Sequence, residues 1–143
     1  MSLNSKLHFI GTVRKTTEEE THIEIHPDYC KGLKGIEEYS HIIILYWMHL
    51  CDNEKDRKTL QVFPRRHKAK VKTGVFACRS PSRPNPVGLS VVELLEKKEC
   101  LLRVRRLDAL EGSPIVDIKP YVPHIDSVAN AHAPQWTRHG VLA

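Results

Sequence analysis

The sequence predicts an all-β protein, built as an antiparallel barrel or sandwich. Short segments with strand-like patterns recur at fairly even spacing between turn-forming residues. No segment carries the roughly ten to fifteen residues of helical period that a crossover between parallel strands requires. The chain also lacks GxGxxG and Walker motifs, which excludes the dinucleotide-binding fold and the P-loop nucleotide hydrolases.

The clearest expected strand spans residues 41–49, a continuous apolar run of β-branched and aromatic residues that predicts a central strand buried on both faces. In the segment 22–26, Ile23 and Ile25 alternate with polar residues, so both isoleucines should face one side. We expect mostly loop at 28–40, with a helical turn or two. We also expect strands at 7–13 and 115–122, and a hairpin formed by 89–95 and 101–107. Residues 75–77 should be extended, and the chain should end in an arm from 126 onward.

The length of 143 residues fits one domain, 1–143, that buries its core without covalent staples. The four cysteines, Cys30, Cys51, Cys78 and Cys100, lie at least twenty residues apart, so their spacing indicates neither a zinc site nor a redox pair. We expect reduced, mostly buried thiols and no metal. The N-terminal residues lack the features of a signal peptide, and the longest apolar run, 42–48, is too short to span a bilayer. These observations predict a cytoplasmic protein without membrane contact.

Residues 74–90, GVFACRSPSRPNPVGLS, are the stretch around which the chain is organised. Each proline in it fixes a backbone dihedral angle and removes a donor, which predicts a stiff loop. The loop carries Arg79, Arg83 and Asn85, and a rigid loop with guanidinium groups suits an anion or a planar polar ligand. A proline-rich connector with solvated arginines explains the composition equally well.

Positive charge is concentrated in one quarter of the chain. Residues 57–92 hold nine Lys and Arg and no acidic residue, whereas the remainder has 13 basic and 17 acidic residues. A one-sided basic field is what a polyanion such as nucleic acid selects, although a solvated basic loop would have the same composition.

Three segments together resemble the TrmO/YaeB (VirR-like) family of S-adenosylmethionine (SAM)-dependent tRNA methyltransferases. They are GVFACRSPSRPNPVGLSVVEL at 74–94, LDALEGSPIVDIKPYVP at 107–123 and GLKGIEEYSHIIILYWMH at 32–49. The resemblance implies a single-sheet antiparallel β-barrel with short helical turns and a C-terminal arm. It also implies a homodimer with SAM near the interface, and methylation of the exocyclic nitrogen of N6-threonylcarbamoyladenosine beside the anticodon of tRNA.

The chain departs from the family pattern at Leu50, where relatives often carry glutamine, in the short connector 14–20, and in lacking the C-terminal extension of longer members. On the rigid loop, Arg83 and Asn85 are the expected substrate contacts. The cofactor contacts that the resemblance implies by position are His49, Leu50, Arg79, Leu89, Arg105, Arg106, Leu107 and Asp108.

Asp117 and Lys119 lie two residues apart on an expected strand and therefore share one face. We hypothesise that Asp117 accepts or orients the proton leaving the methylated nitrogen, and that Lys119 neutralises the threonylcarbamoyl carboxylate. An Asp–Lys pair that only braces the strand end is the alternative. Two other functions also fit the sequence: a non-catalytic RNA-binding barrel, and a small-molecule SAM methyltransferase on the same fold.

Overall fold

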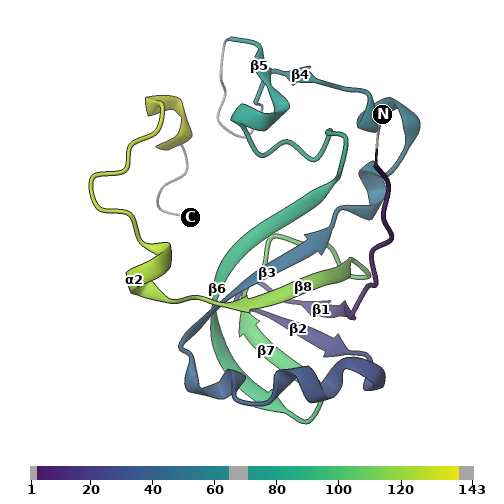
Figure 1. Cartoon of the computed structure of the whole chain (residues 1–143), viewed down its shortest axis with the longest axis vertical. Helices are drawn as coiled ribbons and strands as arrows, with labels where there is room; N and C mark the ends of the chain where they lie inside the picture. The colour runs from purple at the N-terminus through teal and green to yellow at the C-terminus, as the bar shows by residue number, and fades with distance from the viewer. Residues whose placement is uncertain (1–2, 65–70, 139–143) are drawn as a thin grey trace. The chain divides into compact units, whose positions relative to one another are not determined.

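The computed structural model, which describes residues 3–64 and 71–138, confirms the all-β class. Six strands close into one antiparallel barrel in the order β1-β2-β7-β6-β3-β8 (Figure 1). The barrel strands are β1 (Gly11–Thr16), β2 (Glu20–Ile25), β3 (His41–Trp47), β6 (Val87–Lys98), β7 (Leu101–Arg105) and β8 (Pro114–Pro120). A separate two-stranded ribbon pairs β4 (Gln61–Val62) with β5 (Thr73–Gly74).

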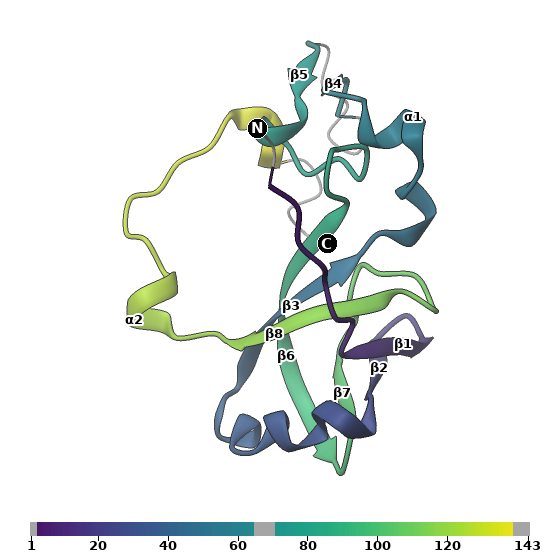
Figure 2. The same cartoon turned by 45° about the vertical axis from the view of Figure 1, so that its right-hand side comes forward.

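Short helices connect the strands, and the helical character of 28–40 exceeds what the sequence predicts. The turns of η1 and η2 run beneath one end of the barrel strands in both views (Figures 1 and 2). In the described ranges, no helix is long and apolar enough to cross a membrane. The 3₁₀ helices are η1 (Pro27–Leu33), η2 (Ile36–Glu38), η3 (His49–Cys51), η5 (Val75–Ala77) and η6 (Gln135–Arg138); the α-helices are α1 (Glu54–Arg57) and α2 (Pro123–Asp126).

The chain forms two compact units. The barrel unit comprises Met1–His49 and Val87–Tyr121, and the second unit comprises Leu50–Pro86 and Val122–Ala143. Each unit is described by itself below. Compactness alone does not define an independently folding domain, so the single domain stays a prediction.

The strand predicted at 41–49 is β3, which pairs with β6 on one side and with β8 on the other. Every strand of this closed barrel has two neighbours, so β3 is not central in the sense of an open sheet. The side chains of Ile42 and Ile44 are fully buried, whereas Ile43 and Leu45 are only partly buried. Burial on both faces is therefore wrong. A closed barrel has one packed interior, so alternate residues of every strand face outward.

The barrel core confirms that Ile23 and Ile25 point inward, with exposed fractions of 0% and 1%. Inward-facing aliphatic side chains of all six strands meet there and exclude water, and each contributes on the order of 1.5–3 kcal/mol. The buried cluster consists of Val13, Ile23, Ile25, Leu33, Ile42, Ile44, Tyr46, Val92, Leu102, Val104, Leu107 and Ile115.

Tyr46 contributes the aromatic ring of this core, and it requires a glycine opposite. Gly88 is its register partner on β6, and a Cβ added at Gly88 would lie 2.3–2.8 Å from ring carbons of Tyr46. The hydroxyl of Tyr46 donates a hydrogen bond to the carbonyl oxygen of Asp108 at 2.7 Å. Tyr46 thus ties β3 to the turn that follows β7.

Several predicted boundaries shift. The first strand begins at Gly11 rather than at residue 7, and extended backbone at 75–77 is wrong because these residues form η5. Strand β6 reaches Lys98, beyond the predicted end at 95, because the polar residues after Leu94 continue the pairing with β7 past a bulge. The hairpin turn is correspondingly tight, with Glu99 at a positive φ of 55°.

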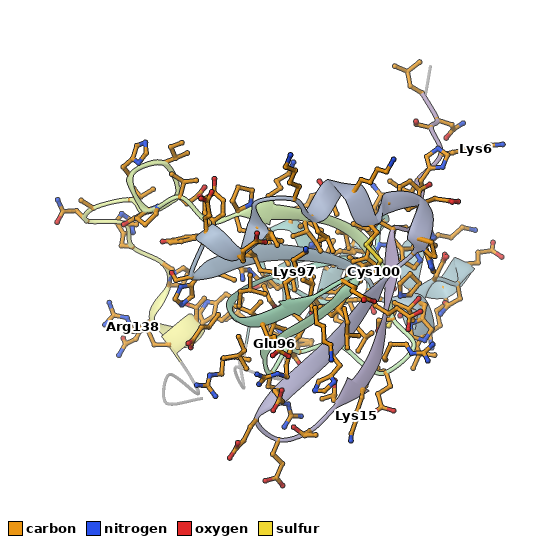
Figure 3. All side chains as sticks on the ribbon, turned by 90° about the horizontal axis from the view of Figure 1, so that it is seen from below. Lys6, Lys15, Glu96, Lys97, Cys100 and Arg138 are labelled. Atoms are coloured by element: carbon orange, nitrogen blue, oxygen red, sulfur yellow. A yellow bond between two sulfur atoms is a disulfide. The ribbon has the colours of Figure 1, made fainter. Side chains whose placement is uncertain are left out.

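The expectation of reduced cysteines is wrong for one pair. Cys30 and Cys100 form a disulfide, with Cα atoms 5.3 Å apart, and Figure 3 labels Cys100 beside the sulfur atoms. The bond links η1 to the β6–β7 turn across 70 residues of sequence. Cys51 and Cys78 are free and only partly buried.

Gly88→Ala should lower the free energy of unfolding by roughly 1–3 kcal/mol, because the methyl group overlaps the ring of Tyr46. This exceeds the stabilisation of about 0.4–1 kcal/mol that alanine brings by restricting the unfolded chain. Urea denaturation measures the change. Gly32→Ala is the matched control, since an added Cβ there has no heavy atom within 4 Å; equal stability of the two variants would contradict the packing role of Gly88.

Candidate functional site

The outer face of β6, β3 and β8 brings together three of the predicted site residues. Leu45 is the register partner of both Leu89 and Asp117, and Ile43 is the partner of both Val91 and Lys119. We call these six residues the outer face: Ile43, Leu45, Leu89, Val91, Asp117 and Lys119. Its centre is aliphatic, with Leu89 45% and Val91 46% exposed. Predicted cofactor and catalytic residues therefore lie on one surface of the barrel unit, on the two strands that flank β3.

Asp117 and Lys119 do share a face, as predicted, and they form an ion pair of 3.2 Å between Oδ2 and Nζ. The other carboxylate oxygen of Asp117 accepts a hydrogen bond from the backbone N–H of Ile118 at 2.9 Å. Both side chains remain accessible, at 45% exposed for Asp117 and 62% for Lys119. The geometry therefore fits a brace at the strand end and also leaves both groups available to a ligand.

A cavity of about 570 Å³ opens in the barrel unit where β8 separates from β1. It combines aliphatic walls with two tyrosines, Tyr29 and Tyr39, and with charged groups that include Lys34, Glu38 and Asp117. Segment 29–39, which includes residues of η1 and η2 and those between and just after them, supplies most of this lining. The sequence predicts mostly connecting loop at 28–40, and so no site there. Periodicity in such short 3₁₀ segments is too brief to indicate which side chains line a cavity.

Residues 105–108 lie on β7 and in the turn after it, and their groups have internal partners. The guanidinium of Arg105 donates to Glu93 at 3.3 Å, and the backbone N–H of Arg106 donates to Glu19. The side chain of Leu107 is in the core at 1% exposed, and its N–H donates to Thr21 Oγ1. A smaller cavity of about 230 Å³ adjoins the turn. These contacts occupy the Arg105 guanidinium and two backbone N–H groups, whereas the side chains of Arg106 and Asp108 are exposed and line the smaller cavity.

His49 ends the barrel unit just after β3, where the family resemblance places a cofactor-contacting histidine. In the described part of the chain its Nδ1 is buried and has no hydrogen-bond partner. A buried polar atom without a partner costs about 1–3 kcal/mol, so this nitrogen is suited to a hydrogen bond with a ligand. Leu50, the first residue of the second unit, is 66% exposed.

In the second unit, Arg83 holds the proline-rich loop together from within. Its Nε donates to the carbonyl oxygen of Ser80 at 2.8 Å, and its Nη2 donates to those of Cys78 at 2.7 Å and Val75. One planar guanidinium thus fixes three carbonyl groups of the same loop. The substrate contact of Arg83 stays a prediction, but the structure gives this side chain an architectural role.

Arg79 and Asn85 point away from that network. Both are exposed, and neither forms a hydrogen bond or an ion pair with any residue that the structure describes. On the barrel surface, Arg14 and Arg105 pair with glutamates, whereas the exposed Arg106, like Arg79, forms no ion pair with a described residue. Arg79 is therefore a cation on a braced loop whose charge no described carboxylate neutralises.

Helix α1 braces the loop from the other side. Ser82 donates to Asp56 at 2.6 Å, and Arg57 bridges Asp52 at 2.6 Å and the carbonyl oxygen of Pro84 at 2.7 Å. The hydrogen bond from Ser82, followed by that from Asn53, lowers the pKa of Asp56. The predicted stiffness of the loop thus has a second source besides its prolines, in side chains that precede it by some 25 residues.

Comparison with known proteins identifies the family to which this chain belongs. The family described as the tRNA-methyltransferase O N-terminal domain matches residues 12–127. This chain belongs to the TrmO family. It is 53% identical over 112 residues to a probable S-adenosyl-L-methionine-binding protein of Methanothermobacter thermautotrophicus, covering 78% of this chain and 77% of that protein.

A TrmO relative with a named reaction is the tRNA (adenine(37)-N6)-methyltransferase of Escherichia coli. It is 37% identical over 123 residues, covering 83% of this chain and 52% of that protein. The crystal structure of TrmO from Pseudomonas aeruginosa matches with a TM-score of 0.71 at 28% identity, covering 93% of this chain and 63% of that one. The chain therefore spans about half of the E. coli protein and under two thirds of the P. aeruginosa chain.

Arg83→Gln should loosen the loop, because each hydrogen bond from a charged donor contributes on the order of 1.5–3 kcal/mol. We expect backbone amides within 74–85 to exchange with deuterium roughly tenfold faster or more, as measured by hydrogen-exchange mass spectrometry. Arg79→Gln removes a similar guanidinium that contacts no described residue, so exchange should be unchanged. Equal exchange in the two variants would rule out the internal clamp.

Proposed function

We propose that this chain is a SAM-dependent methyltransferase that modifies the exocyclic nitrogen of N6-threonylcarbamoyladenosine beside the anticodon of tRNA. The family match over residues 12–127 carries the proposal. The reaction in the name of the E. coli relative and the cofactor in the name of the M. thermautotrophicus relative support it. The basic stretch 57–92 agrees with a polyanionic substrate.

SAM supplies an activated methyl group when bound, and it presents a carboxylate, an adenine and a positive sulfur. We assign its carboxylate to Arg79, an exposed guanidinium without a described partner on the loop that Arg83 holds together. Nδ1 of His49 offers a hydrogen bond, and the side chain of Leu89 offers apolar contact. Leu50 is retained by position, and so are Arg106 and Asp108, which are exposed and line the smaller cavity. Arg105 and Leu107 are left out, because the guanidinium of Arg105 bonds Glu93 and the side chain of Leu107 lies in the core.

The Asp117–Lys119 pair suggests how the substrate nitrogen could lose its proton. A threonylcarbamoyl carboxylate arriving at Lys119 would compete for its ammonium group, which now contacts Asp117 at 3.2 Å. The released carboxylate oxygen of Asp117 could then accept a hydrogen bond from the nitrogen to be methylated. Substrate binding and activation of the base would thereby be coupled through one ion pair.

The partners we propose are tRNA, contacted in part by Asn85 and by the loop that Arg83 holds together, and a second copy of the chain. The aliphatic centre of the outer face supports self-association, because Leu89 and Val91 expose nearly half of their surface. A cytoplasmic location stays a prediction.

Mass spectrometry of nucleosides tests the reaction and the substrate together. After incubation with isotope-labelled SAM and total tRNA, the label should appear in N6-threonylcarbamoyladenosine. Arg79→Ala should abolish the thermal shift that SAM causes in the unaltered protein. Label in adenosine without the threonylcarbamoyl group would keep the enzyme class and overturn the proposed substrate.

Asp117→Asn should reduce turnover by about 10²–10⁴-fold, because the amide cannot accept the proton, while SAM affinity stays nearly unchanged. Initial rates with saturating SAM and calorimetric SAM titration measure the two effects. Glu93→Gln removes an ion pair with Arg105 on the same barrel unit and serves as the control. Full activity of Asp117→Asn would leave Asp117 as a brace of the strand end.

The thermal shift with SAM, together with tRNA binding measured at several salt concentrations, distinguishes the two alternative functions. A non-catalytic RNA-binding barrel would ignore SAM and still bind tRNA. A small-molecule methyltransferase would keep the SAM-dependent thermal shift but show no salt-sensitive binding of tRNA.

A further inference from the structure

Phe76 is exposed to a degree that is unusual for a phenylalanine. Its side chain is 82% exposed, more than any other aromatic side chain in the described ranges; Phe63 follows at 53%. Burial of such a ring contributes roughly 1.5–3 kcal/mol. An exposed ring on a structured segment therefore offers another molecule a flat apolar face.

The backbone that carries Phe76 is fixed on both sides. The preceding residue, Val75, is 1% exposed, and its N–H donates to the carbonyl oxygen of Leu60 at 2.9 Å. Arg83 binds the carbonyl oxygens of Val75 and Cys78, which flank Phe76 and Ala77 in sequence. The ring is therefore preorganised, with only its two side-chain torsions free, and a partner that stacks on it loses little conformational entropy.

The charge around Phe76 favours a nucleic-acid partner. Lys72, four residues before it, is exposed and forms no ion pair with a described residue, in contrast to Lys58, which pairs with Glu54. The stretch 57–92 that contains both Lys72 and Phe76 has no acidic residue. A flat ring with an unneutralised cation four residues before it in sequence matches two parts of a nucleotide, its base and its phosphate. A ring that encloses a small cofactor would line a cavity. Phe76 lines neither of the two cavities described above.

We propose that Phe76 is a stacking platform for an unpaired base of the RNA substrate, held in place by Arg83, and that Lys72 neutralises a nearby phosphate. The inference rests on the proposed function, because it assigns to tRNA a contact that the reaction itself does not require. Arg83 is a positioning residue in this account: it acts on RNA through the backbone of Phe76.

The test compares a fluorescent 15-nucleotide oligo(rA) with an abasic ribose-phosphate chain of the same length. In anisotropy titrations, Phe76→Ala should weaken oligo(rA) binding roughly 5- to 150-fold and leave abasic binding unchanged, because only the first probe has bases to stack. Lys72→Gln should weaken both probes and lower the slope of log Kd against log salt by roughly 0.7. Phe76→Trp should restore oligo(rA) binding, whereas Phe76→Leu, which keeps apolar area without a π-face, should not.

Val128→Ala is the matched control, since Val128 is a 70% exposed apolar residue outside the basic stretch. It should bind both probes as the unaltered protein does. Equal weakening of both probes in Phe76→Ala, or no weakening, would overturn the proposal. Two further results for Phe76→Ala would also overturn it. Loss of SAM affinity with unchanged oligo(rA) binding would assign the ring to the cofactor. A changed molar mass in light scattering with unchanged RNA binding would assign the ring to a contact between copies of the chain.

The outcomes separate this inference from the proposed function. If the protein methylates tRNA but Phe76→Ala binds oligo(rA) normally, the methyltransferase stands and the stacking platform falls. If the protein methylates no tRNA but prefers oligo(rA) to the abasic chain through Phe76, the platform stands and the methyltransferase falls. A protein that binds neither probe refutes the platform directly.

Discussion

The ring of Tyr46 is the contact on which the barrel depends, because three distant segments meet at it. Tyr46 belongs to β3, its ring lies across Gly88 at the start of β6, and its hydroxyl bonds the carbonyl oxygen of Asp108 after β7. These residues come from the three segments that carry the family resemblance. Gly88 and the turn after β7 are therefore both required by the packing of Tyr46, apart from any role in catalysis.

Much of the fold was predictable because strands are a local property. The apolar run 41–49 predicted β3, which ends at Trp47, and the alternation of Ile23 and Ile25 predicted β2. Residues 75–77 have the same apolar composition but form a 3₁₀ turn, because the hydrogen bonds from Arg83 override local preference. The disulfide could not be foreseen either, since its cysteines are 70 residues apart and meet only through the tertiary fold.

The candidate site was predictable only in part, for a similar reason. Spacing along β8 correctly placed Asp117 and Lys119 on one face, but their alignment with Leu89 through Leu45 depends on strand register. The two loop arginines look equivalent in sequence and differ completely in the structure. Arg83 donates hydrogen bonds to three carbonyl groups of its own loop, whereas Arg79 is exposed. Only the hydrogen-bond geometry distinguishes an architectural arginine from one that is available to a ligand.

The pairing of β3 with β6 has a consequence for how this chain can vary. Trp47 and Val87 are register partners, so segment 48–86 leaves and re-enters the barrel at neighbouring positions. Closing a longer loop between such positions adds only about 0.6 kcal/mol for each doubling of its length. Insertions or deletions within 48–86 should thus be tolerated by the barrel strands. Evolution can remodel the segment while the barrel persists as a stable frame.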